Sequence, residues 1–118
     1  GKYHNTDVEL WGDGYQRREL VYIDDAVDVM IELLNVDNEI FNIGSGQDHS
    51  IRSFAKKLCS IFDYEHDKII YNTNRYVGVR AKRLNVDKIK SLGWEPKIGL
   101  REGIESTYKW YKDDNRVQ

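Results

Sequence analysis

The side chains of this chain that could do chemistry do not form a catalytic or metal-binding set. The three histidines, His4, His49 and His66, are scattered, and their spacing to one another and to the single cysteine matches no metal site. Cys59 falls on the apolar side of a predicted helix, where a neutral buried thiol is expected rather than a nucleophile. The sequence therefore predicts no catalytic residue and no metal ligand.

Two further features need an interpretation before they are assigned to chemistry. Asp24 and Asp25 are adjacent at a predicted helix start, so their side chains point in different directions, and helix capping is favoured over paired acid–base work. Gly44-Ser45-Gly46 follows a predicted strand, but the third glycine of a dinucleotide-binding loop is missing, since His49 stands there. A tight turn is the better interpretation of this loop, and a phosphate contact is the alternative.

Composition limits the class of protein. The chain has 118 residues, of which 40% are hydrophobic and 32% charged, so one globular domain or part of one is expected. The net charge of −2 favours neither a nucleic-acid partner nor a membrane surface, and no apolar run approaches the ~20 residues that cross a bilayer. A single cysteine excludes an internal disulfide, and the first residues lack an apolar signal segment, so a cytoplasmic location is expected.

The elements that must position these residues follow from periodicity and turn residues. The predicted strands are residues 8–11, 20–23, 40–43 and 68–71, and the predicted helices are residues 26–34, 51–62, 85–92 and 100–111. Ser50 and Asn85 are expected to cap the second and third helices. The first helix is apolar on most sides and is expected to be well buried. The fold class is therefore α/β, with short strands and about four helices.

Four segments that together reach across nearly the whole chain carry short motifs in a fixed order. The first runs from Trp11 to Asp25 and contains Gly-x-Gly, then Arg-Glu, then an apolar run and Asp-Asp. The others are Phe41-Asn42-Ile43-Gly44-Ser45-Gly46, Leu92-Gly93-Trp94-Glu95-Pro96 and Leu100-Arg101-Glu102-Gly103-Ile104. Their order and spacing resemble the C-terminal part of extended short-chain dehydrogenase/reductases, the NAD-dependent epimerase/dehydratase family.

This resemblance implies a domain assignment. Residues 1–118 would be the C-terminal substrate-binding portion, and the N-terminal Rossmann domain, with its glycine-rich loop and catalytic Tyr-x-x-x-Lys, is not present in this chain. Tyr108 and Lys112 have that spacing, but they lie in the last helix, where the family has no catalysis. The parent enzyme would use NADP or NAD, and no cofactor is expected for this chain alone. The missing Rossmann domain would be a partner, to whose sheet residues 40–43 would add a strand, and self-association is expected without it.

The resemblance also implies site residues. Within the family the chain is most similar to GDP-L-fucose synthases, in which the residues matching Trp11, Arg18 and Lys82 contact the nucleotide sugar. Arg80 falls where other epimerases of the family have a nucleotide-binding arginine. A diphosphate attracts cations, and an indole stacks on a base or a sugar. The structural alternatives are that Trp11 is a core residue and that the cations are solvated, as one of Arg17 and Arg18 is expected to be.

The resemblance implies that the parent is a sugar-nucleotide epimerase or reductase and that this portion is inactive alone. A GDP-L-fucose synthase would perform 3,5-epimerisation and 4-reduction of a GDP-4-keto-6-deoxymannose. Another nucleotide-sugar epimerase or dehydratase of the family stays open, because Tyr15-Gln16-Arg17 and Leu20 depart from the fucose synthase pattern. The alternative of a different class is a stand-alone, non-catalytic binding or interaction module.

Overall fold

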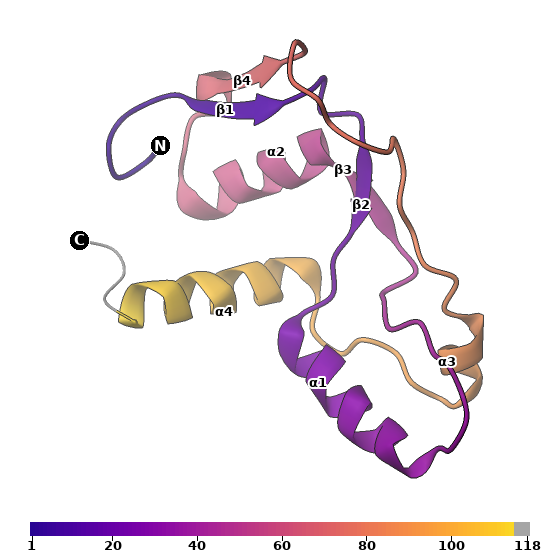
Figure 1. Cartoon of the computed structure of the whole chain (residues 1–118). Coiled ribbons are helices and arrows are strands. Elements are labelled where there is room, and N and C mark those ends of the chain that lie inside the picture. The colour runs from indigo at the N-terminus through magenta and orange to yellow at the C-terminus, as the bar shows by residue number, and fades with distance from the viewer. Residues whose placement is uncertain (115–118) are drawn as a thin grey trace. The chain divides into compact units, whose positions relative to one another are not determined.

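The computed structural model describes residues 1–114 and confirms the α/β class (Figure 1). In chain order the elements are β1 (Val8–Trp11), β2 (Arg17–Glu19), α1 (Ile23–Glu32), β3 (Asp48–Ser50), α2 (Ile51–Phe62), β4 (Ile69–Asn72), α3 (Asp87–Ser91) and α4 (Leu100–Asp113). Short 3-10 turns cover Leu33–Asn35 and His66–Lys68. Among the described residues, no helix is long and apolar enough to span a membrane.

The chain divides into two compact units. The first unit comprises Gly1–Arg18 and Asp48–Arg83, and the second comprises Glu19–Gln47 and Leu84–Gln118. The chain therefore passes from one unit to the other three times. Each unit has its own way of holding its elements together.

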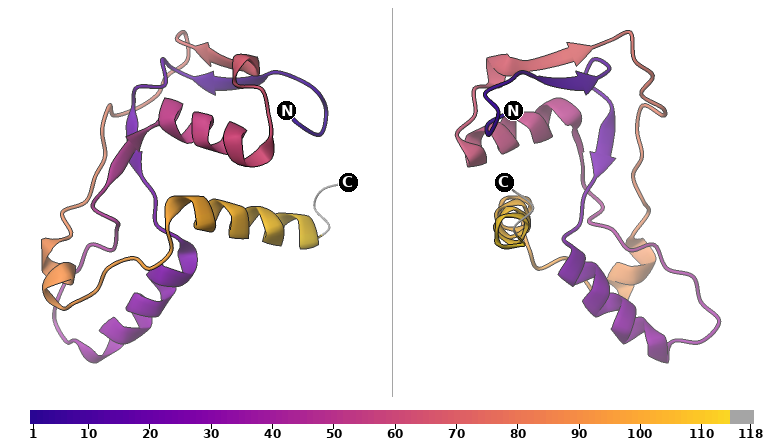
Figure 2. Two further views of the ribbon diagram at one scale, coloured as in Figure 1. Left: turned by 180° about the vertical axis from the view of Figure 1, so that it is seen from behind. Right: turned by 60° about the vertical axis from the view of Figure 1, so that its left-hand side comes forward.

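The first unit is built on β1 and β4, which pair in parallel from Val8 with Ile69 to Trp11 with Asn72. Figure 2 shows α2 running along one side of this pair, and α2 buries Phe54 and Cys59. The Oγ of Ser50 accepts the backbone N–H of Ser53 at 3.1 Å, which confirms the predicted cap. The bounds of α2 are also those predicted, residues 51–62, because apolar residues recur regularly at helical spacing along this segment.

The second unit has an apolar core to which α1 and α3 both contribute. Val29, Val86, Ile89 and Trp94 are buried there, and partly buried apolar side chains from the connecting segments pack against them. Ile89 is 1% exposed and Val29 is 2% exposed, so these two side chains are almost completely removed from water. This burial holds α1 and α3 to the segments between them.

The predicted capping role of Asp24 and Asp25 is wrong. The residue before α1 is Tyr22, and no side chain caps this helix. Asp25 is buried, and its Oδ2 accepts the backbone N–H groups of Lys97 at 3.1 Å and Ile98 at 2.8 Å. A carboxylate that leaves water needs hydrogen-bond donors, and two from a distant segment satisfy it here.

Two predicted strands are absent from the described residues. Residues 20–23 follow β2 without pairing, and α1 already begins at Ile23. In residues 40–43, Phe41 and Ile43 pack on the core while Ile40 is 86% exposed, so the side chains alternate as in a strand. No other segment of the described chain pairs with this backbone, and a strand requires a partner. Conversely, β3 is too short to give a sequence pattern.

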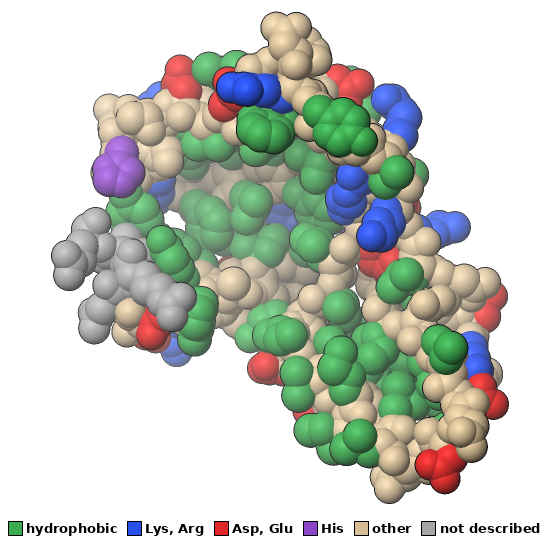
Figure 3. Space-filling view, in the orientation of Figure 1, with side chains coloured by type: hydrophobic (Ala, Val, Ile, Leu, Met, Phe, Trp, Pro, Cys, Tyr) green, Lys and Arg blue, Asp and Glu red, His purple; other side chains and the backbone are tan. Residues whose placement is uncertain are grey.

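The expected burial of α1 is also wrong. Ala26 and Val29 are buried, but five apolar side chains on the other side are 42–79% exposed: Ile23, Val27, Met30, Ile31 and Leu34. These five recur at helical spacing and form what we call the α1 apolar face. Figure 3 shows hydrophobic side chains gathered over this helix. Apolar composition predicted burial, but the second unit supplies cover for only one side of α1.

Candidate functional site

The residues predicted to bind substrate lie in the first unit, on two neighbouring segments. Arg17 and Ala81 form a parallel bridge, in which Arg17 N–H donates to Arg80 O at 2.7 Å and Lys82 N–H donates to Arg17 O at 3.3 Å. Side chains alternate along an extended backbone, so Arg18 and Lys82 point to one side of this bridge and Arg17 to the other. The backbone pairing therefore brings two of the predicted cations together.

Arg18 has an environment suited to an external anion. Its side chain is half-buried, and its guanidinium donates to two neutral carbonyls, Arg17 O at 2.6 Å and Val77 O at 3.4 Å. Within residues 1–114, no carboxylate lies within ion-pair distance of it. The carbonyls orient the guanidinium without neutralising its charge.

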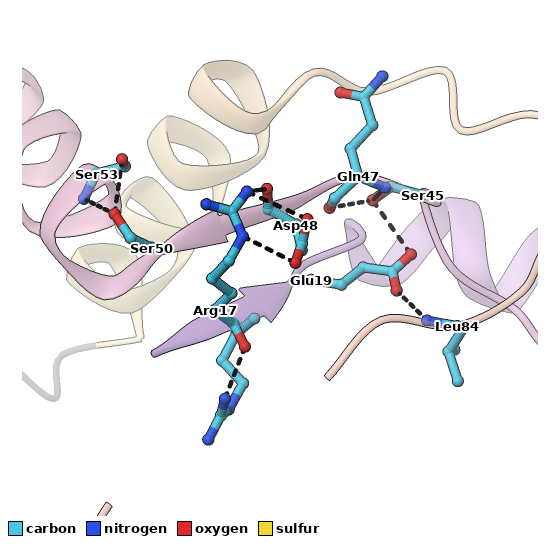
Figure 4. A network of polar contacts seen from close by, with 9 residues as sticks. Arg17, Glu19, Ser45, Gln47, Asp48, Ser50, Ser53 and Leu84 are labelled. Atoms are coloured by element: carbon cyan, nitrogen blue, oxygen red, sulfur yellow. Dashed lines mark hydrogen bonds and ion pairs between the residues drawn. The ribbon is translucent and has the colours of Figure 1, made fainter. Parts of the chain in front are cut away.

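Arg17, its neighbour in sequence, is fully engaged within the chain. Its guanidinium pairs with Asp48 at 3.0 Å and 3.2 Å and donates to Asp48 O at 2.7 Å (Figure 4). The hydrogen bond from Arg17 lowers the pKa of the Asp48 carboxyl, and the same bond raises the pKa of the guanidinium. Arg17 thus links β2 to β3, and it lies in a strand rather than in a turn, although its side chain is 48% exposed.

Trp11 lies at the end of β1 and is 55% exposed, so the alternative of a core tryptophan is wrong. The Arg75 guanidinium lies 5.4 Å from the centre of its ring. Nε2 of the buried Gln16 donates to Trp11 O at 2.9 Å and fixes the backbone there. An exposed indole with an immobilised backbone can stack on a flat ligand.

Arg80 and Lys82 are the more solvated of the predicted cations. The Arg80 side chain is 77% exposed and forms an ion pair with Asp13 at 3.6 Å, so an anionic ligand would compete with Asp13 for it. Lys82 is exposed, and within the described residues no acid pairs with it. The bridge with Arg17 fixes its backbone rather than its ammonium group.

The segment of residues 72–82 runs beside residues 11–18 and gathers these side chains in the first unit. Gly12 N–H donates to Asn72 O at 2.7 Å, and a Cβ at Gly12 would lie 2.3 Å from Val77 Cγ1. Gly12 also has a φ of +87°, a conformation that side chains other than glycine disfavour. This close approach explains the first glycine of the Gly-x-Gly motif, whereas a Cβ at Gly14 would lie 2.5 Å from Tyr71 Cε1 and 2.7 Å from Arg52 Cγ.

Sequence reasoning missed two residues, one in the first unit and one in the second. Arg75, over the Trp11 ring, also forms an ion pair with Glu9 at 3.8 Å, and no sequence signal marks a pairing across this distance. The second is Glu19, whose carboxylate receives the donors of the Gly44-Ser45-Gly46 loop. Its place directly after Arg18 was visible, but its partners were not. Elsewhere, Cys59 is buried as expected, and burial raises the pKa of its thiol.

Comparison with known proteins shows which family this chain resembles in sequence and fold. The family model for the NAD dependent epimerase/dehydratase family matches residues 1–44. A probable GDP-L-fucose synthase of Oryza sativa subsp. japonica is 32% identical over 111 residues, which are 92% of this chain and 34% of that protein.

Two solved structures extend the comparison. The UDP-glucose 4-epimerase of Thermotoga maritima, solved with UDP-glucose, has a TM-score of 0.80 and 35% identity over 93% of this chain and 36% of its own. The GDP-mannoheptose C4 reductase of Campylobacter jejuni, with NADP bound, has a TM-score of 0.73 and 36% identity over 91% of this chain and 35% of its own. The chain spans 34–36% of the length of these three proteins. It belongs to the NAD-dependent epimerase/dehydratase family.

Proposed function

We propose that this chain is the nucleotide-sugar-binding portion of an NAD(P)-dependent sugar-nucleotide epimerase or reductase. The observation that carries the proposal is the environment of Arg18. Two neutral carbonyls orient its guanidinium, and its side chain lies on the same side of the Arg17–Ala81 bridge as that of Lys82. The similarity to a GDP-L-fucose synthase and to a UDP-glucose-binding epimerase supports the ligand class.

Each residue has a distinct task in this proposal. Arg18 forks onto diphosphate or ribose oxygens, and Lys82 adds a point charge to the same group. Trp11 stacks on the base or the sugar. Arg80 binds the diphosphate once its ion pair with Asp13 is broken. Holding the non-reacting nucleotide end fixes the sugar for the chemical step, which is how remote binding energy serves catalysis.

In this proposal the residues described here hold the substrate and not the cofactor. The chain's Gly-x-Gly loop at residues 44–46 has its donors on the Glu19 carboxylate and so offers no cradle to a pyrophosphate. NADP or NAD would be held, together with the catalytic residues, by a Rossmann domain outside these residues. The isolated chain is therefore expected to bind a nucleotide sugar without turning it over.

The finer proposal is a GDP sugar, with the epimerisation and reduction of a GDP-4-keto-6-deoxymannose as the parent reaction. It is supported by the similarity to a GDP-L-fucose synthase and to a reductase of a GDP sugar. The alternative within the family is another nucleotide-sugar epimerase or dehydratase, as the likeness to a UDP-glucose epimerase illustrates. A stand-alone binding module is the alternative outside enzyme function.

Titration of the chain with GDP, UDP, CDP and dTDP sugars tests the proposal. Arg18→Ala should weaken the preferred ligand by about 1–3 kcal/mol, the cost of a lost charged hydrogen bond. Arg101→Ala is the matched control, because Arg101 forms an exposed ion pair with Glu105 on α4 at 2.7 Å. Equal affinity of the Arg18 variant and the unaltered chain would remove Arg18 from the site. Failure of all four sugars to bind would contradict the proposed function.

A further inference from the structure

The Glu19 carboxylate joins segments that lie far apart in the sequence (Figure 4). Its Oε1 accepts the Ser45 hydroxyl at 3.3 Å and also the backbone N–H of Gly46, and its Oε2 accepts the backbone N–H of Leu84 at 2.9 Å. All of these contacts lie in the second unit. Among the described residues no basic side chain pairs with Glu19, so hydrogen bonds alone stabilise its charge.

The Gly44-Ser45-Gly46 loop is shaped around this carboxylate. A Cβ at Gly44 would lie 2.5 Å from Glu19 Oε1, so a larger residue there would displace the carboxylate. Gly46 has a φ of +71°, which glycine adopts without strain, and in this conformation its N–H donates to Glu19 Oε1. Neighbouring donors in a glycine-rich loop can hold an external anion, and here the Ser45 hydroxyl and the Gly46 N–H hold a carboxylate of the chain itself.

The bonds of Glu19 fall beside the proposed substrate-binding cations in the sequence. Glu19 is covalently bonded to Arg18, and Leu84 stands two residues after Lys82. The bridge of Arg17 with Ala81 already pairs the two segments on the other side of these cations. The Glu19–Leu84 bond therefore closes the pairing at its far end, and Arg18 and Lys82 lie between two fixed points.

We propose that Glu19 is a positioning residue that holds Arg18 and Lys82 at the spacing of a diphosphate. This inference rests on the proposed function, because it assigns those two cations to a nucleotide diphosphate. Glu19 touches no ligand. It acts through the backbone of Leu84, and the glycine loop anchors its other oxygen.

Glu19→Gln is the primary test, because it preserves size and replaces one acceptor oxygen by a donor that faces an N–H. Binding of GDP, UDP, CDP and dTDP is measured by NMR titration, each against its own nucleoside. The affinity for the preferred diphosphate should fall about tenfold, the scale of one charged hydrogen bond, while the nucleoside changes by less than about twofold. Gly44→Ala should reproduce this difference, because it displaces the same carboxylate without removing its charge. Glu105→Gln, on the exposed face of α4, should change neither affinity.

A double variant separates positioning from general damage. If Glu19 acts through Lys82, Glu19→Gln should add less than about twofold to the loss already caused by Lys82→Ala. Full multiplication of the two losses, or an equal loss of diphosphate and nucleoside binding, would make Glu19 a merely structural residue and overturn the inference. Undiminished diphosphate binding by Glu19→Gln would overturn it as well and leave the proposed function intact. Failure of the unaltered chain to bind any of the four diphosphates would contradict both.

Discussion

The two units of this chain hold their elements by different means. The first unit aligns its segments by backbone pairing and by polar contacts such as Arg17 with Asp48, and it leaves Arg18, Lys82 and Trp11 available for a ligand. The second unit depends on a buried apolar core and on the Asp25 carboxylate, and it leaves the α1 apolar face exposed. Side chains free of structural tasks thus form the proposed binding site in the first unit and an uncovered apolar surface in the second.

The largest expected effect tests the polar contact that the second unit does bury. Asp25→Asn replaces a buried carboxylate that accepts two backbone N–H groups, so the free energy of unfolding should fall by about 1–3 kcal/mol. Asp24→Asn is the matched control, because Asp24 is exposed, and it should stay within about 0.5 kcal/mol. Urea unfolding of the two variants measures both values. A loss no greater for Asp25 than for Asp24 would show that the buried contact does not stabilise the second unit.

A smaller effect concerns the polar pairing of the first unit and its dependence on pH. The pKa of Asp48 is lowered in the folded chain from its ordinary value of 3.8 by the hydrogen bond from Arg17, so its contribution to stability is present above that value. The contribution is lost as the pH falls through the lowered pKa. The unaltered chain should therefore exceed Asp48→Asn in stability at about pH 6, and this advantage should be smaller at about pH 3, below the ordinary pKa. Curves that remain parallel in urea unfolding at both pH values would exclude this linkage.

The smallest effect on stability is expected for a substitution in the α1 apolar face, where self-association should change instead. Ile31 is 59% exposed, so Ile31→Lys should change the free energy of unfolding by less than about 0.5 kcal/mol. The same change should reduce self-association, which an uncovered apolar face favours. Asn35→Lys adds the same charge at an exposed position outside the α1 apolar face. Light scattering of a concentrated solution distinguishes them, and a monomeric unaltered chain would refute the expectation.

The sequence predicted those elements whose stabilising contacts are local. The helix of residues 51–62 and its Ser50 cap depend on spacing within one segment, and both were found. The bridge between Arg17 and Ala81 and the partners of Asp25 and Glu19 join residues far apart in the chain, which no periodicity reveals. The predicted strand at residues 40–43 and the predicted burial of α1 were wrong for a related reason. Composition specifies which side chains can be buried but not which segment covers them.

The candidate site was predictable in part. The motifs pointed to Trp11, Arg18, Arg80 and Lys82, and the structure holds all four in the first unit. The motifs could not show that Arg17 pairs with a carboxylate and Arg18 does not, because this depends on Asp48, which lies far from both in the sequence and contacts Arg17. The anchoring of residues 44–46 on Glu19 was hidden in the same way.

The central claim is that the first unit carries a nucleotide-sugar site, and an NMR titration of the chain with its preferred nucleotide sugar tests it most directly. The account predicts saturable shifts of the Trp11 indole N–H and of the backbone amides of Arg18 and Lys82. It also predicts that the amides of Val29 and Ile89, in the core of the second unit, stay unchanged. Saturable shifts confined to the second unit, or no saturable shift with any nucleotide sugar, would contradict it.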